Sequence, residues 1–174
     1  MSGRPWRVVV VDDEPPARAT LRLLLSRDAR FTLVAECAHG EQAVEAVAAH
    51  RPDLLLLDVQ MPGMDGFEVL RAIGTSAVPA IVFVTAFDRY ALKAFETHAL
   101  DYLLKPFSDE RCAAVLDRAE ARLRERALAA TGRRLAGLLA ERRAHTAPDH
   151  LVVRESGRTL VIPYDDIVWI EAED

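Results

Sequence analysis

The sequence predicts an α/β fold, a doubly wound parallel sheet of five strands, from three observations. Short apolar runs alternate with segments whose apolar residues recur at helical spacing, so a strand and a helix repeat five times within the first 110 residues. The apolar runs lack polar alternation, which is typical of strands buried on both faces. Right-handed crossovers then favour the strand order 2-1-3-4-5 for a sheet of this length.

The predicted elements follow one another in chain order. Strands are expected at Trp6–Val11, Phe31–Glu36, Asp53–Leu57, Ala80–Val84 and Asp101–Leu104. Helices are expected at Pro15–Ser26, Glu41–His50, Gly66–Ile73 and Asp88–Ala99, with a further helix from Ser108. In the sequence MPGMDG, two glycines permit a tight turn, and Asp65 is a suitable N-cap for the helix that follows.

The composition favours a globular, cytoplasmic protein. Hydrophobic residues make up 51% of the 174 residues, which excludes a wholly disordered chain, and the net charge of −5 does not suggest a dedicated nucleic-acid coat protein. No apolar run approaches the roughly 20 residues of a membrane span, and the start MSGRPWR lacks a secretory signal. We therefore expect no membrane association. Cys37 and Cys112 have no CxxC spacing and are interpreted as buried free thiols.

The charge is distributed unevenly along the chain. Residues 1–110 carry 11 basic and 16 acidic side chains, residues 111–147 carry 9 and 4, and residues 148–174 carry 2 and 7. These shifts indicate three regions, and the resemblances given below set the expected domain bounds at 1–125, 126–147 (a helical linker) and 148–174. The basic middle has the pattern of a long amphipathic helix with a break expected at Gly132. It could be a solvated surface helix, a dimer-forming or signal-transmitting helix, or a phosphate-binding stripe.

Polar side chains follow several strands at their carboxyl ends. Asp12 and Asp13 follow the first strand, Asp58 the third, Thr85 the fourth and Lys105 the fifth. In an open parallel sheet these ends share one edge, and ligands bind in the crevice where the strand order reverses, between the first and third strands. We therefore expect the three carboxylates to meet there.

Three converging carboxylates repel one another unless a cation offsets their charge. Mg²⁺ fits best because it binds one or two carboxylates directly, keeps several waters and completes its shell with phosphate oxygens. Asp58 is then the predicted nucleophile that forms an aspartyl-phosphate, while the Thr85 hydroxyl and the Lys105 ammonium neutralise phosphoryl oxygens. The chain has 20 Arg but only 2 Lys, so a Lys just before Pro106 indicates a specific role, and a cis bond there would turn it into the site.

Four motifs in sequence, VVVVDDE, LLLLDVQMPGMDG, FVTAFD and DYLLKPF, resemble the receiver domain of two-component response regulators. The resemblance covers roughly residues 6–125. It implies a flavodoxin-like receiver fold with the strand order given above. It also implies that a sensor histidine kinase supplies the phosphoryl group.

By the same resemblance, the core residues have defined roles. Asp12, Asp13 and Asp58 would bind Mg²⁺ together with the backbone carbonyl of Gln60, and Asp58 would be the phosphoacceptor. Thr85 and Lys105 would contact the phosphoryl group. Thr85 would also act with Tyr102 as a switch, with Thr85 moving toward the phosphoryl group and Tyr102 turning inward behind it.

The last 27 residues resemble the opening strands of a LytTR-type DNA-binding domain, as in the LytR/AlgR-like family. Two strand-like runs flank Ser156-Gly157-Arg158, which is a hairpin signal, and a third run spans Ile167 to Ile170. The match covers about a quarter of such a domain, so we expect the chain to be cut within it. The resemblance implies that the parent protein binds promoter DNA and that this chain alone binds it weakly or not at all.

The expected output is a phosphorylation-dependent change of the receiver surface, with a homodimer as the usual result. We expect no enzyme activity beyond the chain's own phosphorylation and dephosphorylation. An aspartate-nucleophile phosphatase would share the aspartyl-phosphate, but it would need its nucleophile on the first strand. The remaining alternative is a receiver-like interaction module that works without phosphate.

Overall fold

The computed structural model describes residues 4–74, 77–86, 99–145, 150–155 and 158–163. Contacts between residues divide the chain into two compact units, Met1–Leu128 and Ala129–Asp174. The expected division at 1–125, 126–147 and 148–174 assigns each region to a kind of domain, which these two units do not test. It therefore stays a prediction.

The first unit is built on a parallel sheet of five strands in the order β2-β1-β3-β4-β5, as predicted. The strands are β1 (Trp6–Val11), β2 (Phe31–Cys37), β3 (Leu54–Leu57), β4 (Ala80–Thr85) and β5 (Asp101–Leu104). Each lies within one residue of its predicted bounds. Val11 pairs with Leu57 in the register of β1 and β3, so the residues that follow these two strands emerge side by side at the carboxyl edge of the sheet.

Four helices belong to the described residues: α1 (Pro15–Ser26), α2 (Gly40–His50), α3 (Gly66–Ile73) and α5 (Asp109–His145). The helix predicted at Asp88–Ala99 falls almost entirely on residues 87–98, outside the described residues. The predicted cap of α3 is confirmed. Asp65 Oδ1 accepts a hydrogen bond of 2.7 Å from the Glu68 amide, and Glu68 Oε2 accepts one of 2.9 Å from the Asp65 amide, which together form a capping box.

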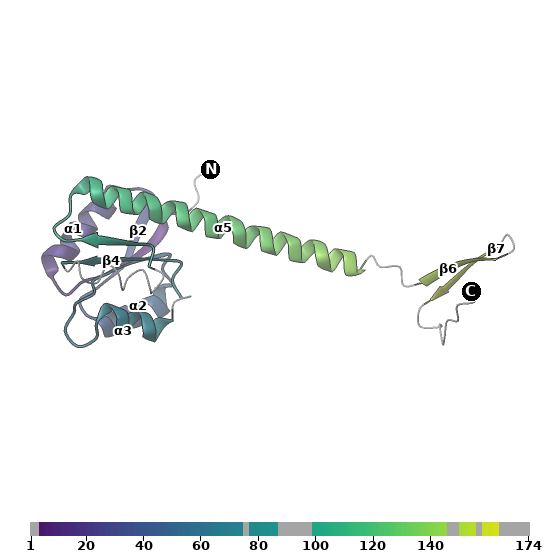
Figure 1. The fold of residues 1–174 in the computed structure, drawn as a ribbon, viewed down its shortest axis with the longest axis horizontal. Coiled ribbons are helices and arrows are strands. Elements are labelled where there is room, and N and C mark those ends of the chain that lie inside the picture. The colour runs from purple at the N-terminus through teal and green to yellow at the C-terminus, as the bar shows by residue number, and fades with distance from the viewer. Residues whose placement is uncertain (1–3, 75–76, 87–98, 146–149, 156–157, 164–174) are drawn as a thin grey trace. The chain divides into compact units, whose positions relative to one another are not determined.

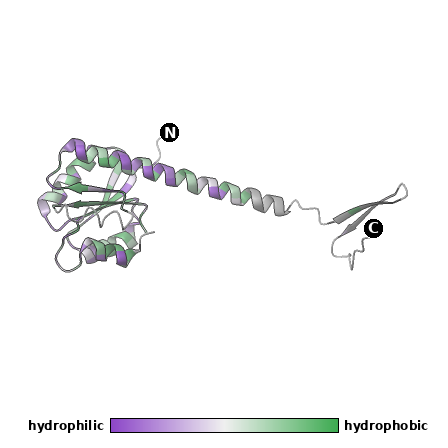
Figure 2. Ribbon diagram, viewed as in Figure 1, coloured by the Kyte–Doolittle hydropathy of each residue, from purple (hydrophilic) through white to green (hydrophobic). Residues whose placement is uncertain are grey.

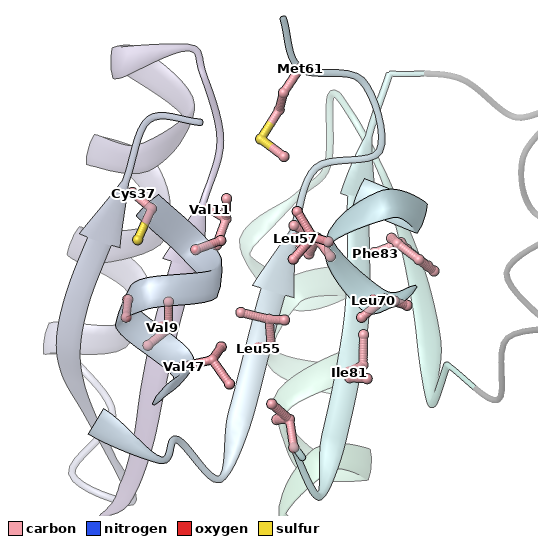
Figure 3. Close-up of a cluster of buried hydrophobic side chains, with 14 of the residues drawn as sticks. Val9, Val11, Cys37, Val47, Leu55, Leu57, Met61, Leu70, Ile81 and Phe83 are labelled. Atoms are coloured by element: carbon pink, nitrogen blue, oxygen red, sulfur yellow. The ribbon is translucent and has the colours of Figure 1, made fainter. Parts of the chain in front are cut away.

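The sheet is apolar on both faces because side chains point alternately to either side along each strand. Val9, Val11, Leu55 and Leu57 belong to one buried cluster, which includes residues of α2 and α3 and is drawn in Figure 3. The intervening residues of the same strands form a second cluster with α1 and α5. Figure 1 accordingly shows α2 and α3 on one side of the sheet and α1 and α5 on the other. This is the doubly wound architecture that the apolar runs predict.

The first part of α5 packs on the sheet, and the next part is exposed. The buried positions of α5 end at Leu123, whereas Leu128, Leu135 and Leu138 are exposed. In Figure 2, hydrophobic (green) and hydrophilic (purple) residues are mixed along this helix. Arg30 anchors the packed part, because its Nη1 lies 2.8 Å from Asp117 Oδ1 and 2.7 Å from Glu120 Oε2.

The expected break at Gly132 is wrong, because α5 runs without interruption from Asp109 to His145. A glycine inside a helix costs only about 1 kcal/mol relative to alanine. The residues around Gly132 are mostly Ala, Leu, Arg and Glu, which are strong helix formers and outweigh that cost.

In the second unit, β6 (His150–Glu155) and β7 (Arg158–Pro163) form a two-stranded antiparallel sheet in which Glu155 pairs with Arg158. This arrangement confirms the predicted pairing of the two runs. The third run, residues 167–170, lies outside the described residues. Within the described ranges, no helix combines the length and the hydropathy that crossing a membrane would require.

Candidate functional site

The carboxyl edge of the sheet brings three carboxylates together. Asp12 and Asp13 follow β1, Asp58 follows β3, and the Asp58 amide donates a hydrogen bond of 2.8 Å to the carbonyl of Val11. One carboxylate oxygen from each of the three aspartates lies within 4.8 Å of the other two. The strand order predicted that these three side chains would lie close together, and they do.

Two of these carboxylates are withdrawn from solvent. Asp12 is 0% exposed and Asp58 is 5% exposed. Burial is the main cause that raises the pKa of Asp12 above its ordinary value, and the negative charge of Asp58 acts in the same direction, whereas Lys105 and the amide of Glu14 oppose the shift. The site therefore concentrates negative charge at a place where water cannot screen it fully.

Lys105 supplies the compensating positive charge. Its Nζ lies 2.6 Å from Asp12 Oδ2, 2.9 Å from Asp58 Oδ2 and 3.2 Å from Glu14 Oε2. Burial disfavours the charged ammonium, but the hydrogen bonds and the attraction from Asp12 and Asp58 outweigh burial, and the pKa of Lys105 lies above its ordinary value. The lysine is therefore fully protonated at neutral pH.

The backbone directs Lys105 toward the acids from the end of β5, at the same carboxyl edge of the sheet. The Lys105 amide donates a hydrogen bond of 2.8 Å to the carbonyl of Thr85, the last residue of β4. The Lys105–Pro106 peptide bond is cis, which is the isomer considered from the sequence. The ends of β1, β3, β4 and β5 thus all contribute to one site, as predicted for a parallel sheet.

Thr85 offers a hydrogen bond that the described residues do not use. Its side chain is completely buried at the end of β4, and its Oγ1 has no hydrogen-bond partner among the described residues. Buried hydroxyls usually have a partner, so an unused one beside an acidic cluster indicates a group that is supplied from outside the chain. Tyr102, the other predicted switch residue, is half-buried on β5, where it pairs with Phe83 of β4.

The loop between β3 and α3 shapes the other side of the site. The Gln60 amide donates a hydrogen bond of 3.1 Å to Asp58 Oδ1, and the Gly66 amide donates one of 2.9 Å to the carbonyl of Val59. A Cβ atom on Gly66 would overlap the carbonyl oxygen of Asp58, so only glycine fits where α3 begins. The proposed role of the Gln60 carbonyl as a metal ligand stays a prediction.

The donor set fits a hard divalent cation. The cluster offers carboxylate oxygens alone, and Mg²⁺ and Ca²⁺ prefer oxygen ligands, whereas zinc sites typically include histidine or cysteine. Asp12, Asp13 and Asp58 are the residues that would hold such an ion. Cys37 and Cys112 are buried and free, as predicted.

Two residues at the site were assigned no role from the sequence. Glu14 contacts Lys105, and Arg18 donates through Nη1 to the carbonyl of Asp12 at 2.6 Å and to that of Asp13 at 3.2 Å. Glu14 could have been found from its position directly after the acidic pair. Arg18 could have been considered because it is a basic residue in the first turn of the helix that follows these acids.

Comparisons with known proteins agree with this geometry. The response regulator receiver domain family matches residues 8–117. The transcriptional regulatory protein BtsR of Salmonella typhi is 49% identical over 112 residues, which are 64% of this chain and 47% of that protein. An uncharacterized response regulatory protein of Shewanella oneidensis is 35% identical over 162 residues, which are 93% of this chain and 64% of that protein.

Solved structures show the same fold. The response regulatory domain of protein mrkE from Klebsiella pneumoniae is 28% identical and superposes with a TM-score of 0.64. That alignment covers 68% of this chain and 98% of the mrkE domain. The chain spans about half the length of the BtsR proteins that it matches.

Proposed function

Because this chain belongs to the response regulator receiver family, we propose that it accepts a phosphoryl group on Asp58 from a sensor histidine kinase. The observation that carries this proposal is the position of Lys105, whose ammonium lies within 3 Å of both Asp12 and Asp58. It supplies a fixed positive charge at the carboxylate that would become phosphorylated.

The chain contributes the nucleophile and its surroundings. A carboxylate oxygen of Asp58 attacks phosphorus, so a P–O bond forms while the P–N bond to the kinase histidine breaks, and the released imidazole takes up a proton. Lys105 and the hydroxyl of Thr85 then hold phosphoryl oxygens. Mg²⁺, held by Asp12, Asp13 and Asp58 with help from the Gln60 carbonyl, would neutralise the negative charge of the incoming group.

Thr85 and Tyr102 would convert this local change into a signal. Thr85 lies buried with an unused hydroxyl, so a phosphoryl oxygen would give it the partner that it lacks. Movement of Thr85 would free space behind it for Tyr102, and the surface around β5 and α5 would change its affinity for partners. Homodimerisation is the output that we propose for this surface.

The rest of the proposed function concerns DNA. Relatives that match the receiver part are named transcriptional regulatory proteins, and the tail resembles the first strands of a LytTR-type domain. We infer that the whole protein controls transcription through such a domain at promoter DNA. The β6–β7 hairpin would be its opening part, and residues 1–174 alone would bind DNA weakly or not at all.

A different reaction class has less support. A phosphatase with an aspartate nucleophile would carry it on the first strand, but the aspartate that Lys105 contacts together with Asp12 follows β3. We therefore propose no turnover of external substrates. A module that works without phosphate remains the second candidate, and the experiment below separates the two.

The test is incubation of the chain with Mg²⁺ and acetyl phosphate, followed by intact mass spectrometry. We expect the mass of one added phosphoryl group, which should be absent after chelation with EDTA and absent in Asp58→Asn. Asp53→Asn is the matched control, because Asp53 lies at the opposite end of β3, and it should be modified like the wild type. An unmodified wild-type chain would support the module that works without phosphate.

A further inference from the structure

We propose that Arg18 is a positioning residue for the divalent cation site, because its guanidinium holds the backbone of Asp12 and Asp13 so that both side chains face Asp58. The inference deepens the proposed function and rests on it, since it concerns the same site. The two hydrogen bonds of the Arg18 guanidinium go to backbone carbonyls and not to the carboxylates themselves.

The contact is a clamp on two consecutive carbonyl groups. Arg18 Nη1 donates to the carbonyl of Asp12 at 2.6 Å and to the carbonyl of Asp13 at 3.2 Å. Both peptide groups lie between the end of β1 and the start of α1, where neither ladder nor helix hydrogen bonds fix the chain regularly. A charged donor is the strongest kind that a protein can offer to a carbonyl.

Arg18 is itself held firmly enough to serve this purpose. Its backbone amide donates to the carbonyl of Glu14 at 3.2 Å, in the first turn of α1. Pro15 and Pro16 begin that helix, and their ring geometry suits the first helical positions. The side chain is half-buried and reaches back over the start of its own helix. The clamp is thus local in sequence and built into the junction between β1 and α1.

The two aspartates depend on this clamp to different degrees. Asp12 is also fixed by its amide, which donates to the carbonyl of Cys37 at 3.1 Å, and by its Oδ1, which accepts from the Glu14 amide at 3.0 Å. The carbonyl of Asp13 is held by Arg18. Rotation of the Asp13 peptide would carry its side chain out of the cluster, so loss of Arg18 should affect Asp13 most.

Geometry and charge predict opposite results for a substitution at Arg18. A guanidinium near the cluster repels a divalent cation, so removal of its charge alone would tighten cation binding. Removal of the clamp would disorder the ligands and weaken binding, as loss of a group that orients metal ligands does, by about 10-fold or more. We infer that geometry dominates, because both short contacts of the guanidinium go to the backbone that carries the ligands.

The experiment measures the dissociation constant for Mn²⁺ by electron paramagnetic resonance, and for Mg²⁺ by calorimetry, without any phosphodonor. The variants are Arg18→Gln and Arg18→Lys, and the control is Arg22→Gln. Arg22 lies one turn further along α1, and its hydrogen bonds go to Glu36. We expect Arg18→Gln to bind about 10-fold more weakly, Arg18→Lys to recover part of the affinity, and Arg22→Gln to bind like the wild type.

The outcomes separate this inference from the proposed function. If the wild type binds the cation and a folded Arg18→Gln binds it equally well or more tightly, the positioning role is overturned while the proposed function stands. If the wild type binds no divalent cation, both fail. Thermal unfolding without metal identifies a variant that is merely unfolded. If Arg18→Gln is unfolded, the cation affinity of Arg18→Lys is the test. An affinity equal to that of the wild type would then overturn the proposed clamp on two carbonyls.

Discussion

Lys105 Nζ lies 2.9 Å from Asp58 Oδ2, although the two residues are 47 positions apart along the chain. The contact exists because β3 and β5 both end at the carboxyl edge of the sheet, on either side of β4. It places an ammonium group at the carboxylate that we propose as the phosphoacceptor. The same ammonium also stabilises the acidic cluster when no other cation is present.

Replacement of Lys105 by methionine should destabilise the chain when divalent cations are absent. The substitution leaves the buried carboxylates of Asp12 and Asp58 without their cation, and removal of one partner from a buried ion pair costs about 3 kcal/mol. Urea denaturation in EDTA measures the loss, and Mg²⁺ should restore part of it. Arg71→Met is the control, because the ion pair that Arg71 forms with Glu68 is exposed, and its loss should cost about 0.5 kcal/mol or less. Equal stability of Lys105→Met and the wild type in EDTA would contradict this account.

Gly66→Ala should destabilise the chain by about 3 kcal/mol. The new methyl group would overlap the backbone carbonyl of Asp58 and press on Cα of Val59, and neither can move like a flexible side chain. Gly132→Ala is the matched control, because a Cβ at Gly132 meets nothing within 4 Å and alanine favours the helix. Chemical denaturation should show a lower free energy of unfolding for Gly66→Ala than for the wild type. Circular dichroism should show equal or greater helicity for Gly132→Ala. If Gly66→Ala unfolds at the same denaturant concentration as the wild type, the loop between β3 and α3 is not packed as described.

Asp65→Ala should lower the free energy of unfolding by about 1 kcal/mol, because it removes the side chain that accepts from the Glu68 amide at the start of α3. Asp65→Ser keeps a hydroxyl at the N-cap and should retain most of the stability. Thermal denaturation of the two variants provides the comparison. If the alanine and serine variants lose the same amount, the cap does not contribute as proposed.

Two buried thiols should make the fold sensitive to alkaline pH. Burial raises the pKa of Cys37 to about 11, against a smaller opposing effect of Arg18. Burial, with the charges of Asp109 and Asp28, raises the pKa of Cys112 to about 11. Each thiol therefore ionises more readily in the unfolded chain, at a pKa of about 8.5, and its contribution to stability is complete below that value. That contribution falls as the pH rises toward about 11.

The measurement is the free energy of unfolding in urea with a reductant, at about pH 8 and about pH 10.5. The wild type should lose up to about 2 kcal/mol per thiol over this interval, since each pKa unit corresponds to about 1.4 kcal/mol. Replacement of Cys37 and Cys112 together by alanine should make the decline shallower. Identical pH slopes for this variant and the wild type would rule out the thiols as its cause.

The sheet and the convergence of the acids could be predicted because they follow from local patterns. Continuous apolar runs fix which segments are buried on both faces, and the parallel arrangement brings Asp12, Asp58 and Lys105 to one edge. The cap at Asp65 could be predicted for the same reason, since it depends only on a residue and the helix that follows it.

Other features depend on geometry that the pattern does not encode. The clamp by Arg18 requires one particular course of the loop between β1 and α1 and one side-chain rotamer, and neither leaves a periodic signal. The contact between Glu14 and Lys105 likewise depends on the course of a loop and on side-chain rotamers. At Gly132 a local rule was given too much weight, because helix propensity is summed over many residues and one glycine does not decide the outcome.

Asp58 is the residue on which we propose that the phosphoryl group is carried. The most direct test is reduction of the chain with borohydride after treatment with Mg²⁺ and acetyl phosphate, followed by peptide mapping, since reduction converts a phosphorylated aspartate into homoserine. We expect homoserine at position 58 alone, and only when Mg²⁺ was present. Homoserine at position 12 or 13, or none at position 58 in a folded chain loaded with Mg²⁺, would contradict it.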